Sequence, residues 1–138
     1  MFELTIKGEV YQFNFGMGFL REINKVAKTP VEGVKGLEQG MGLRFRVGGL
    51  LDGDPEALVD VLDIANKTEK PRVTRALLDS HIDDPDTDIE ALFAEVLDFL
   101  STSNATKKVT ADLQEMAALE QMKKEAQIAE VKAAIQKK

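Results

Sequence analysis

Four carboxylates near the middle of the chain have the spacing closest to a chemical site. Asp84, Asp86 and Asp88 alternate along the sequence, and Glu95 follows eleven residues after Asp84. This is the 1, 3, 5 and 12 spacing of an EF-hand calcium loop, whose carboxylate oxygens surround a hard cation. Position 6 of such a loop is glycine because the chain turns sharply there, and here it is Ile89. Ile89 also begins an apolar helical stripe, so the sequence favours an acidic helix N-terminus over a calcium site.

Two further patterns that could do chemistry are incomplete. His81 is the single histidine, and with no cysteine or second histidine it cannot complete a metal-binding set. Ser80 beside it forms no catalytic pair, because adjacent residues of a helix point in different directions. The Gly-x-Gly patterns at 16–18 and 40–42 lack the third glycine and the βαβ framework of a dinucleotide site. We therefore predict no enzyme activity, no cofactor and no metal site.

The charge of the chain is unevenly distributed. Residues 1–51 carry 7 basic and 5 acidic groups, whereas residues 52–98 carry 4 basic and 14 acidic groups. A nucleic-acid partner would require a basic surface, so we expect none. The acidic segment is either a solvated surface or a docking face for a basic protein partner.

Composition restricts the class of protein. A chain of 138 residues with 43% hydrophobic residues fits one domain, or one domain with a tail. Because it has no cysteine, disulfides and cysteine-ligated zinc or iron–sulfur sites are excluded. The N-terminus lacks the basic start and apolar run of a signal peptide, and no run reaches membrane-spanning length. We expect a soluble cytoplasmic protein with no membrane partner.

The elements that must position any binding surface begin with a hairpin. Residues 2–6 and 10–13 alternate like strands around a Lys7-Gly8 turn, and a lone hairpin is marginal, so it must pack on helices. We expect Phe13, Phe15 and Phe19 to clamp it onto them. The next helix is predicted from about 18 to 28, ended by Thr29-Pro30.

The glycine-rich segment that follows is ambiguous. Alternation over residues 43–47 fits a strand, whereas an apolar stripe through Met41 and Phe45 fits a helix. We favour a glycine-loosened helix over about 42–51.

The remaining helices have clearer signals. Asp54-Pro55 caps a helix over 55–66. Lys70-Pro71 opens a short helix whose inward residues are Val73, Ala76 and Leu77, and residues 83–88 form a polar turn. Ile89 to Leu100 make the cleanest amphipathic pattern. Residues 110–138 contain seven alanines and no glycine or proline, which predicts a further helix.

These elements predict a mainly α fold, with an N-terminal β-hairpin packed on a compact helical domain and a long C-terminal helix. We place the core domain at 1–106 and the helical extension at 107–138. The apolar positions of the extension do not hold one heptad phase, so it is not a committed coiled coil. Its methionines suit an adaptable interface with a neighbouring subunit or client helix. The candidate partner-binding residues are Leu113, Met116, Leu119, Met122, Ile128, Val131 and Ile135.

Several blocks in a fixed order resemble a known family. After the hairpin come FGMGFLRE (15–22), GMGLRF (40–45), GLLDGDPEALVDVLDIA (49–65), KPRVTRALLDSHIDD (70–84) and DIEALFAEVLDFLSTSNATKKV (88–109). Read together, they resemble the tail assembly chaperones of long-tailed bacteriophages and prophages of Gram-positive bacteria. The resemblance covers about residues 1–109 and not the last 30 residues, and its motifs are packing and capping residues.

This resemblance implies a mostly helical, non-catalytic protein of virion assembly. Such chaperones act in the host cytoplasm, are absent from the mature virion, bind the tape measure protein and help recruit tail tube subunits. They tend to self-associate, and many have a longer form made by ribosomal frameshifting. The alternative is a small acidic adaptor or regulatory protein that docks a basic partner through residues 52–98, and docking by charge would weaken steeply with salt.

Overall fold

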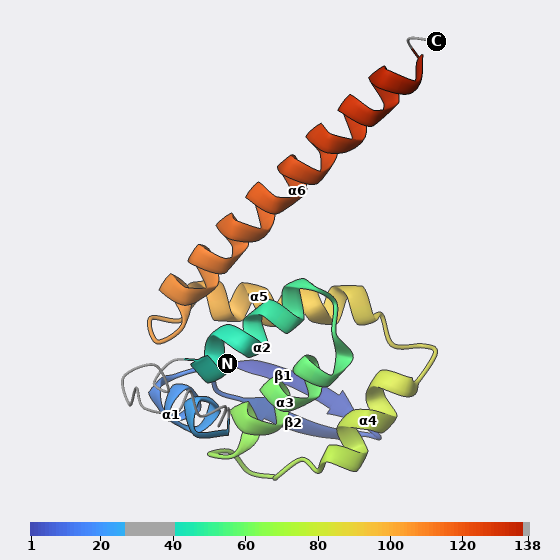
Figure 1. Ribbon diagram of the computed structural model, residues 1–138. Coiled ribbons are helices and arrows are strands. Elements are labelled where there is room, and N and C mark those ends of the chain that lie inside the picture. Colours follow the sequence, from blue (N-terminus) through green and yellow to red (C-terminus); the bar gives the residue numbers. More distant parts are fainter. Residues whose placement is uncertain (27–40, 137–138) are drawn as a thin grey trace.

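The computed structural model describes residues 1–26 and 41–136, and Figure 1 shows how their elements are arranged. Within these residues a hairpin and five helices pack together, and a sixth helix leaves this body at one end. The elements are β1 (Phe2–Ile6), β2 (Glu9–Phe13), α1 (Met17–Val26), α2 (Met41–Leu51), α3 (Pro55–Asn66), α4 (Arg75–Asp83), α5 (Ile89–Thr102) and α6 (Lys107–Gln136). The predicted fold class is confirmed. The predicted helix end at 28 and its Thr29-Pro30 stop lie outside the described residues.

A two-residue turn closes the hairpin. Lys7 and Gly8 both have positive φ, at 51° and 82°, as the twist of a tight antiparallel hairpin requires. The strands pair in the register Phe2↔Phe13 and Leu4↔Tyr11. One face of the ribbon is therefore apolar and faces the helices.

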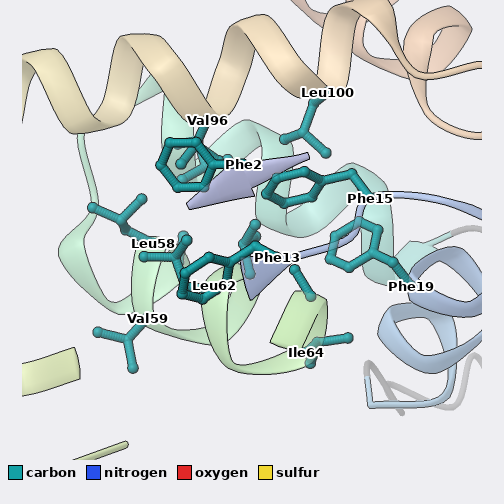
Figure 2. Close-up of a cluster of buried hydrophobic side chains, with 14 of the residues drawn as sticks. Phe2, Phe13, Phe15, Phe19, Leu58, Val59, Leu62, Ile64, Val96 and Leu100 are labelled. Atoms are coloured by element: carbon teal, nitrogen blue, oxygen red, sulfur yellow. The ribbon is translucent and has the colours of Figure 1, made fainter. Parts of the chain in front are cut away.

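A cluster of phenylalanines holds the hairpin on the helical body (Figure 2). The ring centroids of Phe2 and Phe13 are 5.7 Å apart, and those of Phe15 and Phe19 are 5.3 Å apart in an edge-on arrangement. Phe2 also lies 5.3 Å from Phe99 of α5. Leu58, Leu62, Val96 and Leu100 of α3 and α5 surround these rings. The prediction that Phe13, Phe15 and Phe19 clamp the hairpin is confirmed.

Helix α2 forms as predicted, and the stripe through Met41 and Phe45 lies on its exposed side. Its buried residues are Gly42, Leu43, Val47 and Leu50, whereas Met41 is 47% exposed and Phe45 is 71% exposed. The cause is a close approach to α1, since a Cβ on Gly42 would meet the backbone at Ile23 and Asn24. Only the glycine side of α2 can face α1 so closely, and this turns the stripe through Met41 and Phe45 outward.

Helix α3 begins as predicted and ends on a buried asparagine. Asp54 Oδ1 accepts a hydrogen bond from the N–H of Glu56 at 3.0 Å, with Pro55 in the first turn. At the other end, Asn66 is fully buried and its amide donates to the carbonyl of Gln12 in β2 at 2.9 Å. This bond ties α3 to the hairpin.

The predicted start of α4 at Lys70-Pro71 is wrong. Residues 71–73 are not helical, and Asn66 donates to the Pro71 carbonyl at 3.2 Å and accepts from the Val73 N–H at 2.6 Å. The helix begins at Arg75, where the hydroxyl of Thr74 accepts from the N–H of Leu77 at 3.2 Å. Its buried residue is Leu78. Val73 is buried as predicted, but Ala76 is exposed and Leu77 is only half-buried.

The acidic run before α5 is a turn and a helix cap, as the sequence favoured. Asp88 Oδ1 accepts from the N–H of Ala91 at 3.1 Å. Asp84 Oδ1 accepts from the N–H of Asp86 at 3.0 Å. Leu92, Val96 and Leu100 then face the core. These carboxylates are used in local backbone hydrogen bonds.

Candidate partner-binding surface

The first turns of α6 are fixed to the body. Thr106 Oγ1 donates to the Leu100 carbonyl at 2.6 Å, Thr110 Oγ1 donates to the Thr106 carbonyl at 2.9 Å, and both threonines are fully buried. Val109 and Leu113 pack against the core, and the helix contacts α2 and α5. Residues 107–113 therefore form the root of α6.

Beyond its root, α6 runs into solvent. Every residue from 114 to 136 is exposed, and Figure 1 shows this part of the helix extending away from the body. At 1.5 Å per residue the free part is about 35 Å long. A helix with no tertiary contacts has only marginal stability in water, so a partner that covers it would stabilise it. Among the helices of the described residues, none is long and apolar enough to cross a membrane.

The predicted binding residues differ in whether they pack on the body or face solvent. Leu113 belongs to the root and packs on the core. The other six are 53–69% exposed: Met116, Leu119, Met122, Ile128, Val131 and Ile135. Exposed apolar residues grouped on one element are typical of interaction surfaces.

The six exposed residues form two groups on different sides of α6. With 3.6 residues per turn, Met116, Leu119 and Met122 point on average about 150° away from Ile128, Val131 and Ile135. We call the first group the methionine face and the second the tip face. Lys124 and Lys132 share one surface with Ile128 and Val131. The two faces therefore point to different sides of the helix.

Helix α2 contributes a further apolar surface that the sequence interpretation missed. Met41 and Phe45 are exposed on the outer side of α2, and the Arg46 guanidinium lies 5.1 Å from the centre of the Phe45 ring. Helix α2 also packs against α6, so the apolar surfaces of the two helices belong to elements in contact. A signal was present: apolar residues surround α2 on all sides, and only the side with Gly42 allows close approach to another helix.

Part of the acidic segment is neutralised inside the protein. Asp60 lies 3.3 Å from Arg46 and 2.9 Å from Arg75, and Asp63 lies 2.9 Å from Arg72 and 3.6 Å from Arg75. The hydrogen bond to Asp60 raises the pKa of Arg75 above its usual value. These pairs hold α2, α3 and α4 together, so their charges contribute less to a docking face for a basic partner than the sequence suggests.

The candidate catalytic and metal-binding residues are dispersed. His81 lies in the last turn of α4, and its backbone carbonyl accepts from Thr87 Oγ1 at 2.7 Å. Within residues 1–26 and 41–136, no three histidine or acidic side chains gather closely enough to hold a metal ion. The arrangement offers surfaces for binding another protein.

Most of the chain matches a known protein family. The sequence profile of the family described as phage tail assembly chaperone protein, TAC, matches residues 3–115. The chain belongs to this family. The match runs from β1 through the root of α6, so it includes the whole body of the chaperone and the junction from which the free helix leaves.

The free part of α6 in this chaperone begins where the family match ends. Residues 116–136 carry both the methionine face and the tip face, so these faces are features of this chain beyond the matched region. Neither a curated protein nor a solved structure matches the chain. Membership of a chaperone family points to binding of other proteins and away from catalysis.

Proposed function

We propose that this chaperone binds the tape measure protein during assembly of a long phage tail, keeps it soluble and helps recruit tail tube subunits. It acts without catalysis in the cytoplasm of the host bacterium and is absent from the mature virion. The observation that carries the proposal is the exposed apolar surface on two helices in contact, α2 and α6.

The chemistry of the methionine face fits a long helical client. Met116 and Met122 are unbranched, so they adapt to different side chains along a client helix. Amphipathic helices bind such surfaces by laying their apolar stripe against them. Burying one apolar side chain of this size contributes about 1.5–3 kcal/mol, so a few contacts suffice for a transient complex. The exposed Phe45 of α2 is a second apolar residue on which a client could lie.

A charge substitution on the methionine face tests this proposal. The variant Leu119→Glu, Met122→Glu should lower the amount of tape measure protein that stays soluble and co-purifies after co-expression. The control Gln114→Glu, Gln121→Glu adds the same charge elsewhere on the exposed part of α6 and should behave like the wild type. Far-UV circular dichroism should show the same helix content in all three proteins. Equal recovery of the client with both variants would contradict the proposal.

The acidic adaptor remains the second candidate, because nine carboxylates of residues 52–98 take part in none of the caps, turns or ion pairs described above. The salt dependence of partner binding distinguishes the adaptor from the chaperone. The Debye length falls from about 10 Å at 0.1 M to about 3 Å at 1 M salt, so docking by charge should be lost over this range. A client held by the methionine face should stay bound.

A further inference from the structure

A groove lies between α2 and the start of α3. An exposed ring, two glycines and three carboxylates line it: Phe45, Gly48, Gly49, Asp52, Asp54 and Glu56. Its volume of about 550 Å³ is in the range of small-molecule pockets, so it can take one long side chain. A Cβ on Gly48 would meet nothing within 4 Å, so this part of the groove is unfilled. We call it the glycine groove.

The α2 side of the glycine groove is a row of residues along one face of the helix. Phe45, Gly48 and Asp52 are spaced i, i+3 and i+7, and the Asp52 N–H donates to the Gly48 carbonyl at 3.0 Å, so the helical turn continues to Asp52. The Phe45 ring, which is 71% exposed, lies at one end of the row. Asp52 lies at the other end, about 10 Å farther along the helix axis. Gly48 leaves the space between them free of a side chain.

The carboxylates of the glycine groove are only partly neutralised. Asp60, which also lines it, is paired with Arg46 at 3.3 Å and with Arg75 at 2.9 Å. Asp52 and Glu56 are exposed, and among the described residues neither lies within 4.0 Å of a lysine, arginine or histidine nitrogen. These two carboxylates therefore favour a cationic occupant.

The positive charge of the groove lies at its other end. Arg44 also lines the groove and is exposed, but it is the neighbour of Phe45 and lies eight residues before Asp52. Along the helix axis this is about 12 Å from Asp52. An occupant with a cationic head at Asp52 and an apolar stem at Phe45 fits this distribution of charge.

We infer that the glycine groove takes an arginine side chain of a partner protein. The aliphatic part of that side chain would lie over Gly48 against the Phe45 ring, and its guanidinium would reach Asp52 and Glu56. Long cationic side chains cover apolar surface with their stem and keep the charged head at polar groups. Arginine fits better than lysine, because its planar guanidinium binds a carboxylate through two hydrogen bonds.

This inference deepens the proposed function and rests on it, because it names the side chain that a client would present to α2. Arginines that fill pockets are frequent hot spots of protein interfaces. Charged contacts set orientation and partner choice more than affinity. The groove would therefore fix the position of a client whose other contacts are adaptable.

Nuclear magnetic resonance of the ¹⁵N-labelled full chain tests the inference with two pentapeptides. One has a single arginine between pairs of alanines, and the other has glutamine in place of the arginine. The arginine peptide should shift the amide signals of Gly48 and Gly49 in a saturable way. Its half-saturating concentration should be at least about threefold lower than that of the glutamine peptide.

Two variants and a control locate the binding site. Gly48→Gln fills the groove where a Cβ meets no other atom, so it should fold and lose the shift of the Gly49 signal. The variant Asp52→Asn, Glu56→Gln should bind the two peptides equally. The control Glu95→Gln, Asp98→Asn removes the same charge from exposed positions of α5 and should prefer the arginine peptide as the wild type does.

Three results would overturn the inference. They are equal binding of the two peptides by the wild type, an arginine preference that survives Asp52→Asn, Glu56→Gln, and shifts that spread over α4 and α5 and persist in Gly48→Gln. The last result would show diffuse attraction to the acidic segment. The variant Leu119→Glu, Met122→Glu leaves the groove intact and should still bind the arginine peptide, so failure of the groove and failure of the proposed function give different results.

Discussion

The close approach of α1 and α2 predicts opposite effects for two glycine substitutions in one helix. In Gly42→Ala, the new Cβ would meet the carbonyl oxygen of Ile23 and lie 2.8 Å from the Cα of Asn24. Both obstacles are backbone atoms, so α1 must move away as a unit. That movement also strains the hydrogen bond of 3.0 Å from the Leu43 N–H to Asn24 Oδ1, which satisfies the start of α2.

The change in the free energy of unfolding caused by Gly42→Ala has two opposing contributions. Overpacking costs about 1–3 kcal/mol, and contact with backbone places this site at the upper end. Replacing glycine by alanine inside a helix returns about 1 kcal/mol. We therefore expect Gly42→Ala to lower the free energy of unfolding by about 2 kcal/mol, or the Tm by about 8 °C.

Gly48 of the same helix is the matched control. A Cβ there would meet nothing within 4 Å. Gly48→Ala should therefore raise the free energy of unfolding by about 0.5–1 kcal/mol, because only the helix propensity and the unfolded-chain entropy change.

Urea unfolding followed by tyrosine fluorescence measures both variants. The chain has one tyrosine and no tryptophan, and Tyr11 is buried in the hairpin, so its emission reports on the body and not on the free part of α6. The reasoning is refuted if Gly42→Ala is as stable as the wild type, or if both substitutions shift stability in the same direction.

Two further predictions concern the ends of elements. Asn66→Ala should lower the free energy of unfolding by about 3 kcal/mol in the same urea assay. The Val73 N–H and the Gln12 carbonyl would each lose their hydrogen-bond partner, which costs about 1–3 kcal/mol per group. A loss below about 1 kcal/mol would show that water replaces the amide. A chain ending at Glu115 should keep the wild-type free energy of unfolding within about 0.5 kcal/mol, whereas a chain ending at Thr106 should lose more than about 2 kcal/mol with the packing of Val109 and Leu113. Equal stability of the two truncated chains would instead support the predicted domain boundary at 106/107.

Local signals account for the parts of the fold that the sequence predicts correctly. Asp54-Pro55 and Asp88 cap helices through atoms two or three residues away, and the turn at Lys7-Gly8 depends on its own backbone. The apolar period of α5 repeats within a few turns. Such interactions are contained in short windows of sequence, so they can be read without knowing what lies across the core.

Two features that the sequence analysis did not predict depend on contacts that a helix makes outside itself. Asn66 at the end of α3 bonds to the backbone of Pro71 and Val73, and α4 begins only at Arg75. Helix α2 turns its glycine side to α1, so Phe45 and the apolar stripe through it face solvent. The apolar period of α2 does not by itself show which of its sides is buried.

The candidate binding surface also has a part that the sequence determines and a part that only the tertiary structure determines. The sequence by itself determined that residues 110–138 favour a helix and which of its residues are apolar, because propensity and residue type are local properties. Only the tertiary structure decided that Leu113 packs on the body, and that Met116 and the apolar residues after it stay uncovered. The physical reason is that exposure depends on which other elements pack against a helix, and sequence periodicity describes only the helix itself.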